Sequence, residues 1–397
     1  MKLLKIIIEN CQFLITKVWY SFYKRNKDVW AFGEWGGNRC CDNCMYFANY
    51  LAESHPEIGL FWITKPSTDL SRLDRRVKVV VMDSKEAAMV LKRAGAVFFA
   101  HTLNDITYRH SLYYSGALIV NFWHGVPWKK IGLDMPLSRL ERIYVRYRMK
   151  TLEAHLYLST SKLFTKVFGT AFECKTDEII TAGYPRNSIF YSKEKINNAR
   201  EHLFAYLVSK GNNFDKSTKV ILYMPTFRDK CQDVFSFDSI MDDERLKSLL
   251  ENHNAIIIQK AHFVTSQRSQ QAEIGVGRFF QATDFPSQEL LAVADILVTD
   301  YSSCFFDYLI LDRPVLHYLY DYEYYADKDR GLYYPKEDAV CGDVAQNEDQ
   351  LIDNIAAYLI NPKKDHELRV RQLGRFLEYE TPHACQEIYA YISKKLG

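Results

Sequence analysis

Along this chain, short apolar runs alternate with longer segments in which apolar residues recur at helical spacing. The short runs are rich in β-branched and aromatic residues, and several are continuously apolar, as in strands buried on both faces of a parallel sheet. In the first half of the chain they are 29–32, 60–64, 77–82, 97–100, 118–122, 156–159 and 179–182. In the second half they are 220–224, 255–259, 296–299 and 315–318.

Helical patterns separate these predicted strands, for example at 84–93, 161–168, 287–294 and 350–359. Alternation of strands and helices on this scale predicts an α/β protein with two doubly wound lobes. A charged stretch at 192–200 and a Gly-Asn-Asn loop signal at 211–213 place the boundary near 188–218. We therefore expect an amino-terminal lobe over 27–195 and a carboxyl-terminal lobe over 196–397, with the last helical segment crossing back.

The first 26 residues show a different pattern. Apolar residues recur there at helical spacing: Leu3, Ile7, Leu14, Val18 and Phe22. Charged residues interrupt the run too often for a spanning helix, and no small-residue cleavage site follows it. The alternatives are a helix at a membrane interface and a helix packed on the core. Trp19 beside Lys24 and Arg25 favours the interface, so 1–26 is predicted as an amphipathic membrane-interface helix.

A second basic segment supports this interpretation. Ser138 and Glu141 form a capping-box pattern at a helix start. Four cations then recur along the helix: Arg139, Arg142, Arg146 and Lys150. A solvated charged face is the simpler alternative, but together with the basic amino end we prefer attraction to anionic lipid.

Composition limits the functional classes. The chain has 397 residues, of which 48% are hydrophobic, so it can bury a core and is not a disordered protein. A net charge of +2 argues against bulk attraction to nucleic acid. Nine cysteines are too few for a disulfide scaffold and indicate a reducing, cytoplasmic setting. Cys40, Cys41 and Cys44 lack a second ligand pair at zinc-finger spacing, so we interpret them as small buried hydrophobic residues.

The strongest local motif follows the strand predicted at 296–299. Asp300 ends this strand, and Ser302 and Ser303 open a helix that runs through Asp307. Two hydroxyls at a helix start, with unpaired N–H groups and the positive dipole end, form a natural phosphate site. An ordinary helix cap is the alternative. Ligands of open parallel sheets lie at the carboxyl ends of the strands, which is where this motif falls.

Other predicted strands also deliver polar groups at their ends. His124 follows the strand at 118–122, beside Gly125, Pro127 and Lys130, and is placed to exchange protons in a cleft. Further cations and one histidine follow other strands or turns: Arg186, Arg228, Lys260, His262 and Arg330. Each signal is weak alone. Together they predict one rim that carries His, Arg, Lys and Ser and suits a polyanionic substrate.

The order of these motifs resembles the CDP-glycerol glycerophosphotransferase family, which includes teichoic acid primases and polymerases and capsule-polymer relatives. The motifs are His-Gly-x-Pro, Gly-Tyr-Pro-Arg-Asn, Pro-Thr-x-Arg-Asp, Lys-x-His, Thr-Asp-Tyr-Ser-Ser-x-x-Phe-Asp-Tyr and Arg-Gly-x-Tyr, between about 118 and 335. The resemblance implies a GT-B fold of two Rossmann-like lobes with a cleft between them. It also implies membrane association through a basic amphipathic surface, no cofactor and no catalytic metal.

The family's site residues carry over by motif. His124 matches the essential histidine proposed as base, and His262 the second essential histidine, which is associated with the donor phosphates. The donor-binding helix start is matched by Ser302, Ser303 and Asp307, and the Arg-Gly-x-Tyr arginine by Arg330. Two positions depart from the pattern: Phe263 replaces a usual Pro, and Ser188 replaces a frequent Asp.

The resemblance implies an enzyme in which a hydroxyl of a membrane-linked saccharide or poly(glycerol phosphate) acceptor attacks CDP-glycerol and releases CMP. His124 would take the proton, and His262, Arg228, Lys260 and the Ser302-Ser303 helix start would offset the charge on CMP. Gly125, Lys130, Arg186 and Asp300 are assigned either acceptor or structural roles. The expected location is peripheral, on the cytoplasmic face of the cell membrane.

Three alternatives stay open at this point. Within enzymes they are transfer of ribitol phosphate from CDP-ribitol and sugar transfer from a nucleotide sugar, because a GT-B lobe pair alone does not set the donor. Outside enzymes, the alternative is a membrane-bound adaptor that holds a nucleotide or polymer. Retention of two histidines argues against the adaptor, because a binding protein needs no proton acceptor.

Overall fold

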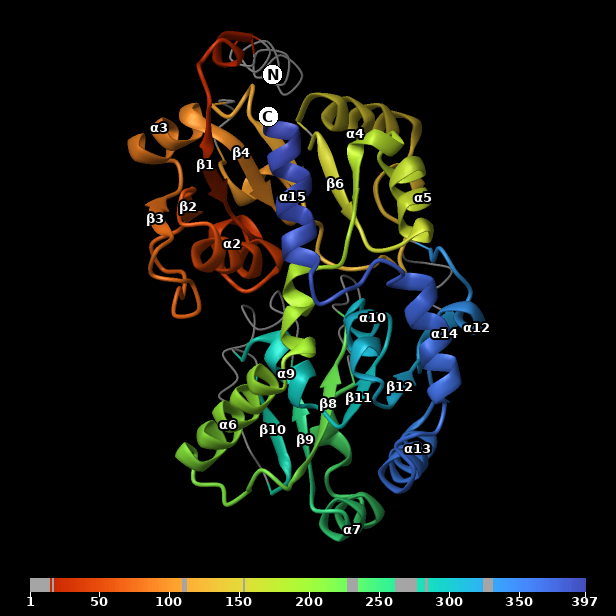
Figure 1. Ribbon diagram of the computed structural model, residues 1–397. Helices are drawn as coiled ribbons and strands as arrows, with labels where there is room; N and C mark the ends of the chain where they lie inside the picture. Colours follow the sequence, from red (N-terminus) through yellow and green to blue (C-terminus); the bar gives the residue numbers. More distant parts are fainter. Residues whose placement is uncertain are drawn as a thin grey trace, which may run out of the picture. The chain divides into compact units, whose positions relative to one another are not determined.

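The computed structural model describes residues 15, 18–108, 113–152, 154–226, 235–260, 277–282, 285–323 and 331–397. The chain divides into two compact units, each built around a parallel sheet (Figure 1). Of the described residues, unit 1 takes those up to His124, Leu137–Ser188 and Tyr379–Gly397. Unit 2 takes Gly125–Pro136 and Ile189–Glu378.

Unit 1 holds a seven-stranded sheet in the order β3-β2-β1-β4-β5-β6-β7. In chain order the strands are β1 Asn26–Phe32, β2 Gly59–Thr64, β3 Lys78–Val81, β4 Ala94–Phe99, β5 Leu118–Asn121, β6 Leu156–Ser159 and β7 Ile179–Thr181. Its helices are α2 Asn43–Ser54, α3 Lys85–Arg93, α4 Arg139–Leu152, α5 Lys162–Ala171 and α15 Ala384–Leu396.

Unit 2 holds a six-stranded sheet in the order β10-β9-β8-β11-β12-β13. Its strands are β8 Lys219–Met224, β9 Ala255–Gln259, β10 Phe279–Gln281, β11 Ile296–Thr299, β12 Val315–Tyr318 and β13 Val344–Ala345. Its helices are α6 Lys193–Ser209, α7 Glu244–Asn252, α9 Ser287–Val293, α10 Cys304–Tyr308, α12 Lys336–Ala339, α13 Glu348–Ile360 and α14 His366–Phe376.

Both sheets have the Rossmann order, in which the first strand lies in the middle. In unit 1, β1 pairs with β2 and β4, and in unit 2, β8 pairs with β9 and β11, all in parallel. The order therefore reverses beside β1 and beside β8, and ligands of such sheets bind outside the carboxyl ends of the strands at that reversal. The predicted α/β fold of the GT-B type, with two Rossmann-like lobes, is confirmed.

The predicted strands are all present, with ends that shift by a few residues. The strands appear in the sequence as continuous apolar runs because helices cover the sheets. Every residue of β4 and of β9, for example, is buried. The sequence analysis did not predict β10 or β13, which are three and two residues long. It also did not predict α2, whose sequence begins in the cysteine-rich stretch.

Polar caps fix the starts of the helices. The Ser84 hydroxyl accepts a hydrogen bond from the Ala87 N–H at 3.0 Å and begins α3. The predicted capping box of α4 is confirmed, because Ser138 N–H donates to Glu141 at 2.9 Å and Glu141 N–H donates to Ser138 Oγ at 3.3 Å. Such caps satisfy N–H groups that the first turn leaves without a partner.

Arg25 fastens the amino-terminal segment to unit 1. Its guanidinium donates hydrogen bonds to four backbone carbonyls, those of Tyr20, Leu91, Tyr113 and Ser115. Residues 18–21 are helical, but residues 1–14, 16 and 17 lie outside the described ranges, so the predicted amphipathic helix stays a prediction. Among the described helices, none is both long enough and apolar enough to cross a membrane.

Candidate active site

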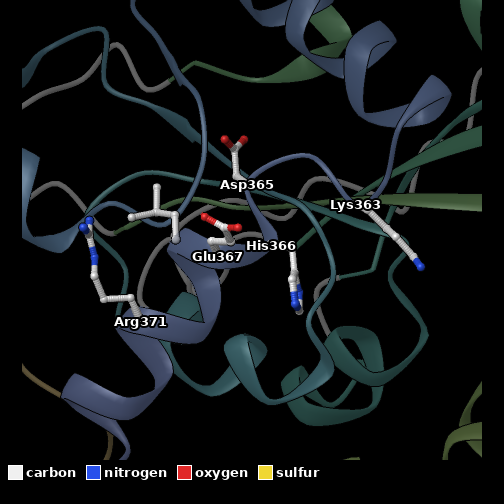
Figure 2. Close-up of a pocket in the computed structure, with 6 residues that line it drawn as sticks. Lys363, Asp365, His366, Glu367 and Arg371 are labelled. Atoms are coloured by element: carbon white, nitrogen blue, oxygen red, sulfur yellow. The ribbon is translucent and has the colours of Figure 1, made fainter.

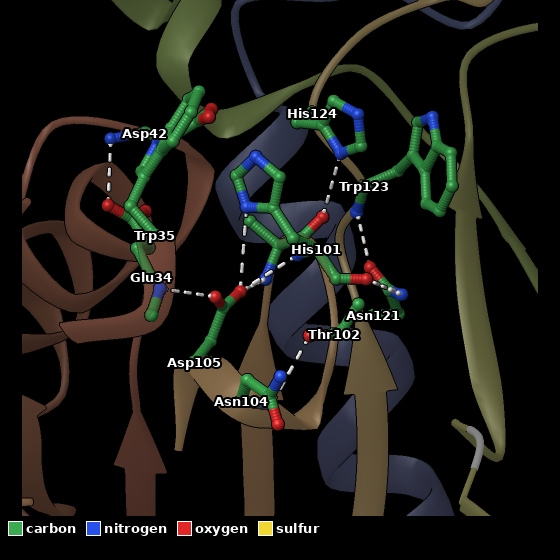
Figure 3. A network of polar contacts seen from close by, with 12 residues as sticks. Glu34, Trp35, Asp42, His101, Thr102, Asn104, Asp105, Asn121, Trp123 and His124 are labelled. Atoms are coloured by element: carbon green, nitrogen blue, oxygen red, sulfur yellow. Dashed lines mark hydrogen bonds and ion pairs between the residues drawn. The ribbon is translucent and has the colours of Figure 1, made fainter. Parts of the chain in front are cut away.

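The carboxyl ends of β1, β4 and β5 gather a polar network in unit 1 (Figure 3). His124 follows β5, His101 follows β4, and Glu34 follows β1. The three strands are neighbours in the sheet, so their ends bring these side chains together although the residues are far apart in sequence.

The direction of the His124 ring is set by one hydrogen bond. Its Nδ1 lies 3.2 Å from the carbonyl oxygen of Ala100. A carbonyl only accepts, so Nδ1 carries the hydrogen in this contact and Nε2 keeps its lone pair. His124 is half-buried and can therefore present an unprotonated nitrogen to a substrate hydroxyl.

The backbone before His124 is strained and held in place. Trp123 has a φ of +57°, a left-handed conformation that is uncommon for a bulky residue. Its N–H donates to the Asn121 side chain at 2.8 Å, and its carbonyl accepts from Asn43 at 2.9 Å. The next turn uses Gly125, with a φ of +141°. Strain of this kind persists only where neighbours fix it, and it is typical of functional sites.

Arg186 ties the histidine loop to the rest of unit 1. Its Nη1 donates to Asp42 Oδ1 at 2.8 Å and to the carbonyl oxygen of His124 at 3.0 Å. Both ionic partners are buried. Burial alone would raise the pKa of Asp42, but the Arg186 guanidinium beside it holds that pKa below its ordinary value. Of the two roles predicted for Arg186, these contacts support the structural one.

The Gly183–Asn187 turn is in turn held by Glu380, which comes from the segment before α15. Its Oε2 accepts from the Tyr184 N–H at 3.1 Å and from the Asn187 side chain at 3.0 Å. A side chain on Gly183 would meet this carboxylate at 2.6 Å. The motif is therefore an anchoring device, and the carboxyl-terminal segment completes it.

Burial, together with the neighbouring His101, lowers the pKa of His124 to about 3. The ring is therefore neutral through the physiological range. A neutral imidazole with a free Nε2 can accept a proton from an attacking hydroxyl. The cation that then forms is disfavoured by burial, so its charge must be balanced by groups nearby.

The sequence analysis missed His101, Asp105 and Glu34. His101 stacks on His124, with 4.2 Å between ring centroids and 11° between planes. Asp105 is buried and accepts hydrogen bonds from the N–H groups of Gly36, Ala100 and His101. Glu34 is buried and accepts from three N–H groups at the start of α2. Spacing alone does not signal them, because each depends on a neighbouring strand end.

The corresponding edge in unit 2 carries the Ser-Ser motif. Ser302 and Ser303 are half-buried and precede α10. Ser303 occupies the cap position, yet its hydroxyl makes no capping hydrogen bond, which disfavours the ordinary-cap alternative. Asp307 lies in α10 and is buried, with the Gln288 amide 3.4 Å from its Oδ2.

Two predicted site residues at this edge make hydrogen bonds to other groups of the protein. Asp300 is fully buried and accepts hydrogen bonds from the N–H and the hydroxyl of Thr226, at 2.6–3.0 Å. This contact joins the ends of β8 and β11. Lys260 is buried at the end of β9, and its Nζ donates to the carbonyl of Phe285. Both residues thus shape the edge, and a direct role of Lys260 toward a donor stays a prediction.

Lys130 lies in the part of unit 2 that follows His124 in the chain. Its N–H donates to the carbonyl of Gly331 at 3.0 Å, and Lys129 forms an antiparallel bridge with Leu332. Trp128 donates from its indole nitrogen to the Tyr334 carbonyl at 2.9 Å. The segment after Gly125 is therefore paired with the Gly-Leu-Tyr end of the Arg-Gly-x-Tyr motif.

Other predicted residues fall outside the described ranges. These are Arg228, His262, Phe263 and Arg330. The described cysteines are free thiols; Cys40 and Cys44 are buried, as predicted, whereas Cys41 is half-buried. Within the described ranges, no group of three or more His, Cys, Asp or Glu side chains has metal-site geometry.

One surface pocket of about 760 Å³ lies at the start of α14 in unit 2 (Figure 2). Its lining mixes three basic side chains, Lys363, His366 and Arg371, with two acidic ones, Asp365 and Glu367. No residue of the predicted site lines it. The charge is mixed and the pocket lies away from the strand ends, so we assign the chemistry to the two sheet edges instead.

Comparison with known proteins gives a family model and several relatives. A family model described as CDP-Glycerol:Poly(glycerophosphate) glycerophosphotransferase matches residues 15–394. A teichoic acid glycerol-phosphate transferase of Staphylococcus aureus (strain NCTC 8325 / PS 47) is 27% identical over 93% of this chain and 94% of its own length. A teichoic acid poly(glycerol phosphate) polymerase of Bacillus spizizenii is 34% identical over 59% of this chain and 60% of its own length.

Two further comparisons define how far the likeness extends. A solved structure of the wall teichoic acid polymerase TagF has a TM-score of 0.78 at 20% identity, over 99% of this chain and 97% of that chain, which shows a shared fold. A poly(ribitol-phosphate) polymerase of B. spizizenii is 27% identical over 66% of this chain. The chain spans less than two thirds of the length of the polymerases among these curated relatives.

Proposed function

The chain belongs to the CDP-glycerol:poly(glycerophosphate) glycerophosphotransferase family, and on this premise we propose that it moves glycerol phosphate from CDP-glycerol to a hydroxyl of a membrane-linked acceptor. The enzyme class follows from the family, which sets aside the adaptor alternative. The acceptor and the roles of individual residues are our proposals. We assign the acceptor to teichoic acid or capsule polymer synthesis, as a lipid-linked saccharide or a poly(glycerol phosphate) chain.

In the proposed reaction an acceptor oxygen attacks the phosphorus that carries glycerol in CDP-glycerol. The new P–O bond forms as the bond to CMP breaks, so the products are a phosphodiester and CMP. His124 Nε2 takes the proton of the attacking hydroxyl. Phosphoryl transfer of this kind depends mainly on positioning and charge stabilisation, so no covalent enzyme intermediate is needed.

The donor side of the proposal rests on unit 2. Ser302, Ser303 and the N–H groups at the start of α10 contact the pyrophosphate, because a hydroxyl pair at a helix start favours anions. Asp307 orients the donor from inside the same helix. His262, Arg228, Lys260 and Arg330 offset the charge that moves onto CMP, as the family motifs imply.

The observation that carries this function is the Nδ1 contact between His124 and the Ala100 carbonyl, which leaves Nε2 as a proton acceptor at a sheet edge. The test is CMP release from CDP-glycerol in the presence of a glycerol-phosphate-bearing acceptor. We expect release that depends on the acceptor. Release that is independent of acceptor, or none at all with several acceptors, would contradict the proposal.

A ribitol donor is the second candidate, because enzymes named for ribitol phosphate also match this chain. The two donors differ only in the polyol, so the same phosphate site serves both. Parallel assays with CDP-glycerol and CDP-ribitol separate them. We expect a higher kcat/KM with CDP-glycerol, and the reverse order would assign the chain to ribitol transfer.

We also propose that unit 1 binds an anionic membrane surface from the cytoplasmic side. Large apolar side chains of the amino-terminal segment are exposed, including Trp19 (66%) and Phe22 (82%). On α4, Leu140 (80%) and Ile143 are exposed beside Arg139 and Arg142. Both elements lie at the top of unit 1 in Figure 1. Exposed apolar groups next to cations are typical of a membrane-interface surface.

Co-sedimentation with anionic vesicles tests this surface. A double variant that carries both Arg139→Gln and Arg142→Gln should bind the vesicles roughly 10- to 30-fold more weakly, since each cation near an anionic surface contributes about 1 kcal/mol. Lys193→Gln with Lys195→Gln on α6 changes the charge equally at exposed positions and is the matched control. Equal loss in both variants would mean that only net charge matters and would remove α4 from the surface.

A further inference from the structure

His101 lies between three groups at the end of β4. One face of its ring is 4.2 Å from the ring of His124, in a nearly parallel stack. The Trp35 ring is also 4.2 Å away, tilted by 58°. Its Nδ1 is 3.5 Å from Asp105 Oδ2, and neither of its ring nitrogens makes a hydrogen bond among the described residues. Buried ring nitrogens without such a bond are unusual and call for an explanation.

Asp105 links His101 to Ala100, whose carbonyl orients His124. Its carboxylate accepts hydrogen bonds from the backbone N–H groups of Ala100 and His101, at 3.1 and 2.8 Å. The same carboxylate accepts from Gly36 N–H at 2.7 Å, which fixes the loop that carries Trp35. The Ala100 carbonyl is the acceptor for His124 Nδ1. One buried carboxylate therefore fixes both groups that orient the His124 ring (Figure 3).

We propose that His101, held by Asp105, is the positioning residue for His124: its ring fixes the plane of the His124 imidazole, and its uncharged state allows that imidazole to take the acceptor's proton. This inference rests on the proposed role of His124 as base. It goes beyond the family resemblance, because His101 lies outside the motifs that carry it.

The charges around the stack explain why the protonation state of His101 matters. Asp42 and Asp105 face the two rings, and Arg186 faces them as a cation. Glu34 lies at the start of α2, and burial raises the pKa of its carboxyl. A proton on His101 would add a second cation against the face of His124 and oppose proton uptake there. A neutral His101 instead presents a polarisable ring face to the imidazolium, with Asp105 behind it. A charge on the ring of His101 should therefore oppose transfer, and a profile of kcat against pH detects such an effect.

The test compares two substitutions that separate stacking from titration. His101→Phe keeps a flat ring but cannot take a proton, and His101→Ala removes both properties. We expect His101→Ala to lower kcat roughly 10-fold or more while KM for CDP-glycerol stays within about twofold. His101→Phe should lose less activity, and its acid limb in the profile of kcat against pH should move to lower pH. His55 also stacks on a tyrosine, Tyr389, in the same unit, so His55→Phe is the matched control and should match the parent.

Two results would overturn the inference. One is an acid limb that is the same in His101→Phe and in the parent, and the other is a His101→Ala variant with kcat within about twofold of the parent. Thermal unfolding and CDP-glycerol binding, measured on each variant, separate loss of function from loss of fold. His124→Ala in the same series separates the two claims: if it remains active the base assignment fails, whereas an inactive His124→Ala with a normal His101→Ala refutes only the role of His101.

Discussion

The two sheet edges have the same topology but different construction. At the edge of unit 1, buried ionisable side chains hold the structure: Asp42 pairs with Arg186, and Asp105 and Glu34 accept backbone hydrogen bonds at the end of β4 and the start of α2. At the described edge of unit 2, two hydroxyls precede the start of α10, and the buried Asp300 joins two strand ends. A Rossmann order thus fixes where a site lies and not what it does.

The difference indicates a division of labour. A base needs a fixed direction and a tuned proton affinity, and a rigid network of buried charges supplies both. A phosphate needs donors and a favourable field, which a helix start supplies and the cations proposed on the donor side reinforce. We therefore expect changes at the edge of unit 1 to affect folding and turnover, and changes at the edge of unit 2 to affect donor binding.

The largest effect should come from breaking the buried ion pair of unit 1. Arg186→Ala leaves Asp42 buried and uncompensated, which typically costs about 3–5 kcal/mol of the free energy of unfolding. Arg76→Ala breaks the exposed Arg76–Asp74 pair and should change the free energy of unfolding far less. Denaturant unfolding of both variants measures the difference. If both variants lost the same free energy of unfolding, Arg186 would not stabilise this sheet edge.

An intermediate effect should come from His317, a buried histidine in β12 of unit 2. Burial lowers its pKa to about 3. Its folded pKa is below its unfolded value of about 6.5, so its contribution to stability is complete above pH 6.5 and is lost as pH falls. At pH 5 the loss is about 2 kcal/mol, from 1.5 pH units at about 1.4 kcal/mol each.

The change in the free energy of unfolding between pH 7 and pH 5 measures this contribution. His317→Gln should be less stable than the parent at pH 7, because Nε2 of His317 accepts a hydrogen bond from the Cys341 N–H. Its stability should nevertheless fall less steeply toward pH 5. His383→Gln, at an exposed position, is the control and should keep the parent's slope. If the stability of His317→Gln fell with pH as steeply as that of the parent, another group would cause the loss of stability in acid.

The smallest effect should come from the hydroxyls of unit 2. Ser302→Ala with Ser303→Ala removes two ligands of the proposed phosphate site and should weaken CDP-glycerol binding roughly tenfold, or about 1.4 kcal/mol, with kcat at saturating donor close to that of the parent. Ser209→Ala, at the exposed end of α6, is the control. Calorimetry gives the affinity, and an unchanged value would place the donor phosphates elsewhere.

Patterns along the chain predicted the two sheets because both sheets are covered on each face, so their strands appear as apolar runs. They predicted His124 and the Ser302-Ser303 motif because each follows such a run directly. They did not predict the pairing of Asp42 with Arg186, which are 144 residues apart and meet only in the folded unit. His101 gave no signal either, since one histidine after an apolar run is common and its significance comes from the stack with His124.

The central claim is that unit 1 supplies the base and unit 2 holds the donor, and one variant tests both parts. His124→Ala should lower kcat for CMP release by about 10²–10⁴, the usual contribution of general base catalysis, while CDP-glycerol affinity measured by calorimetry stays within about threefold. Loss of donor binding in this variant, or a kcat within a few-fold of the parent, would contradict the account.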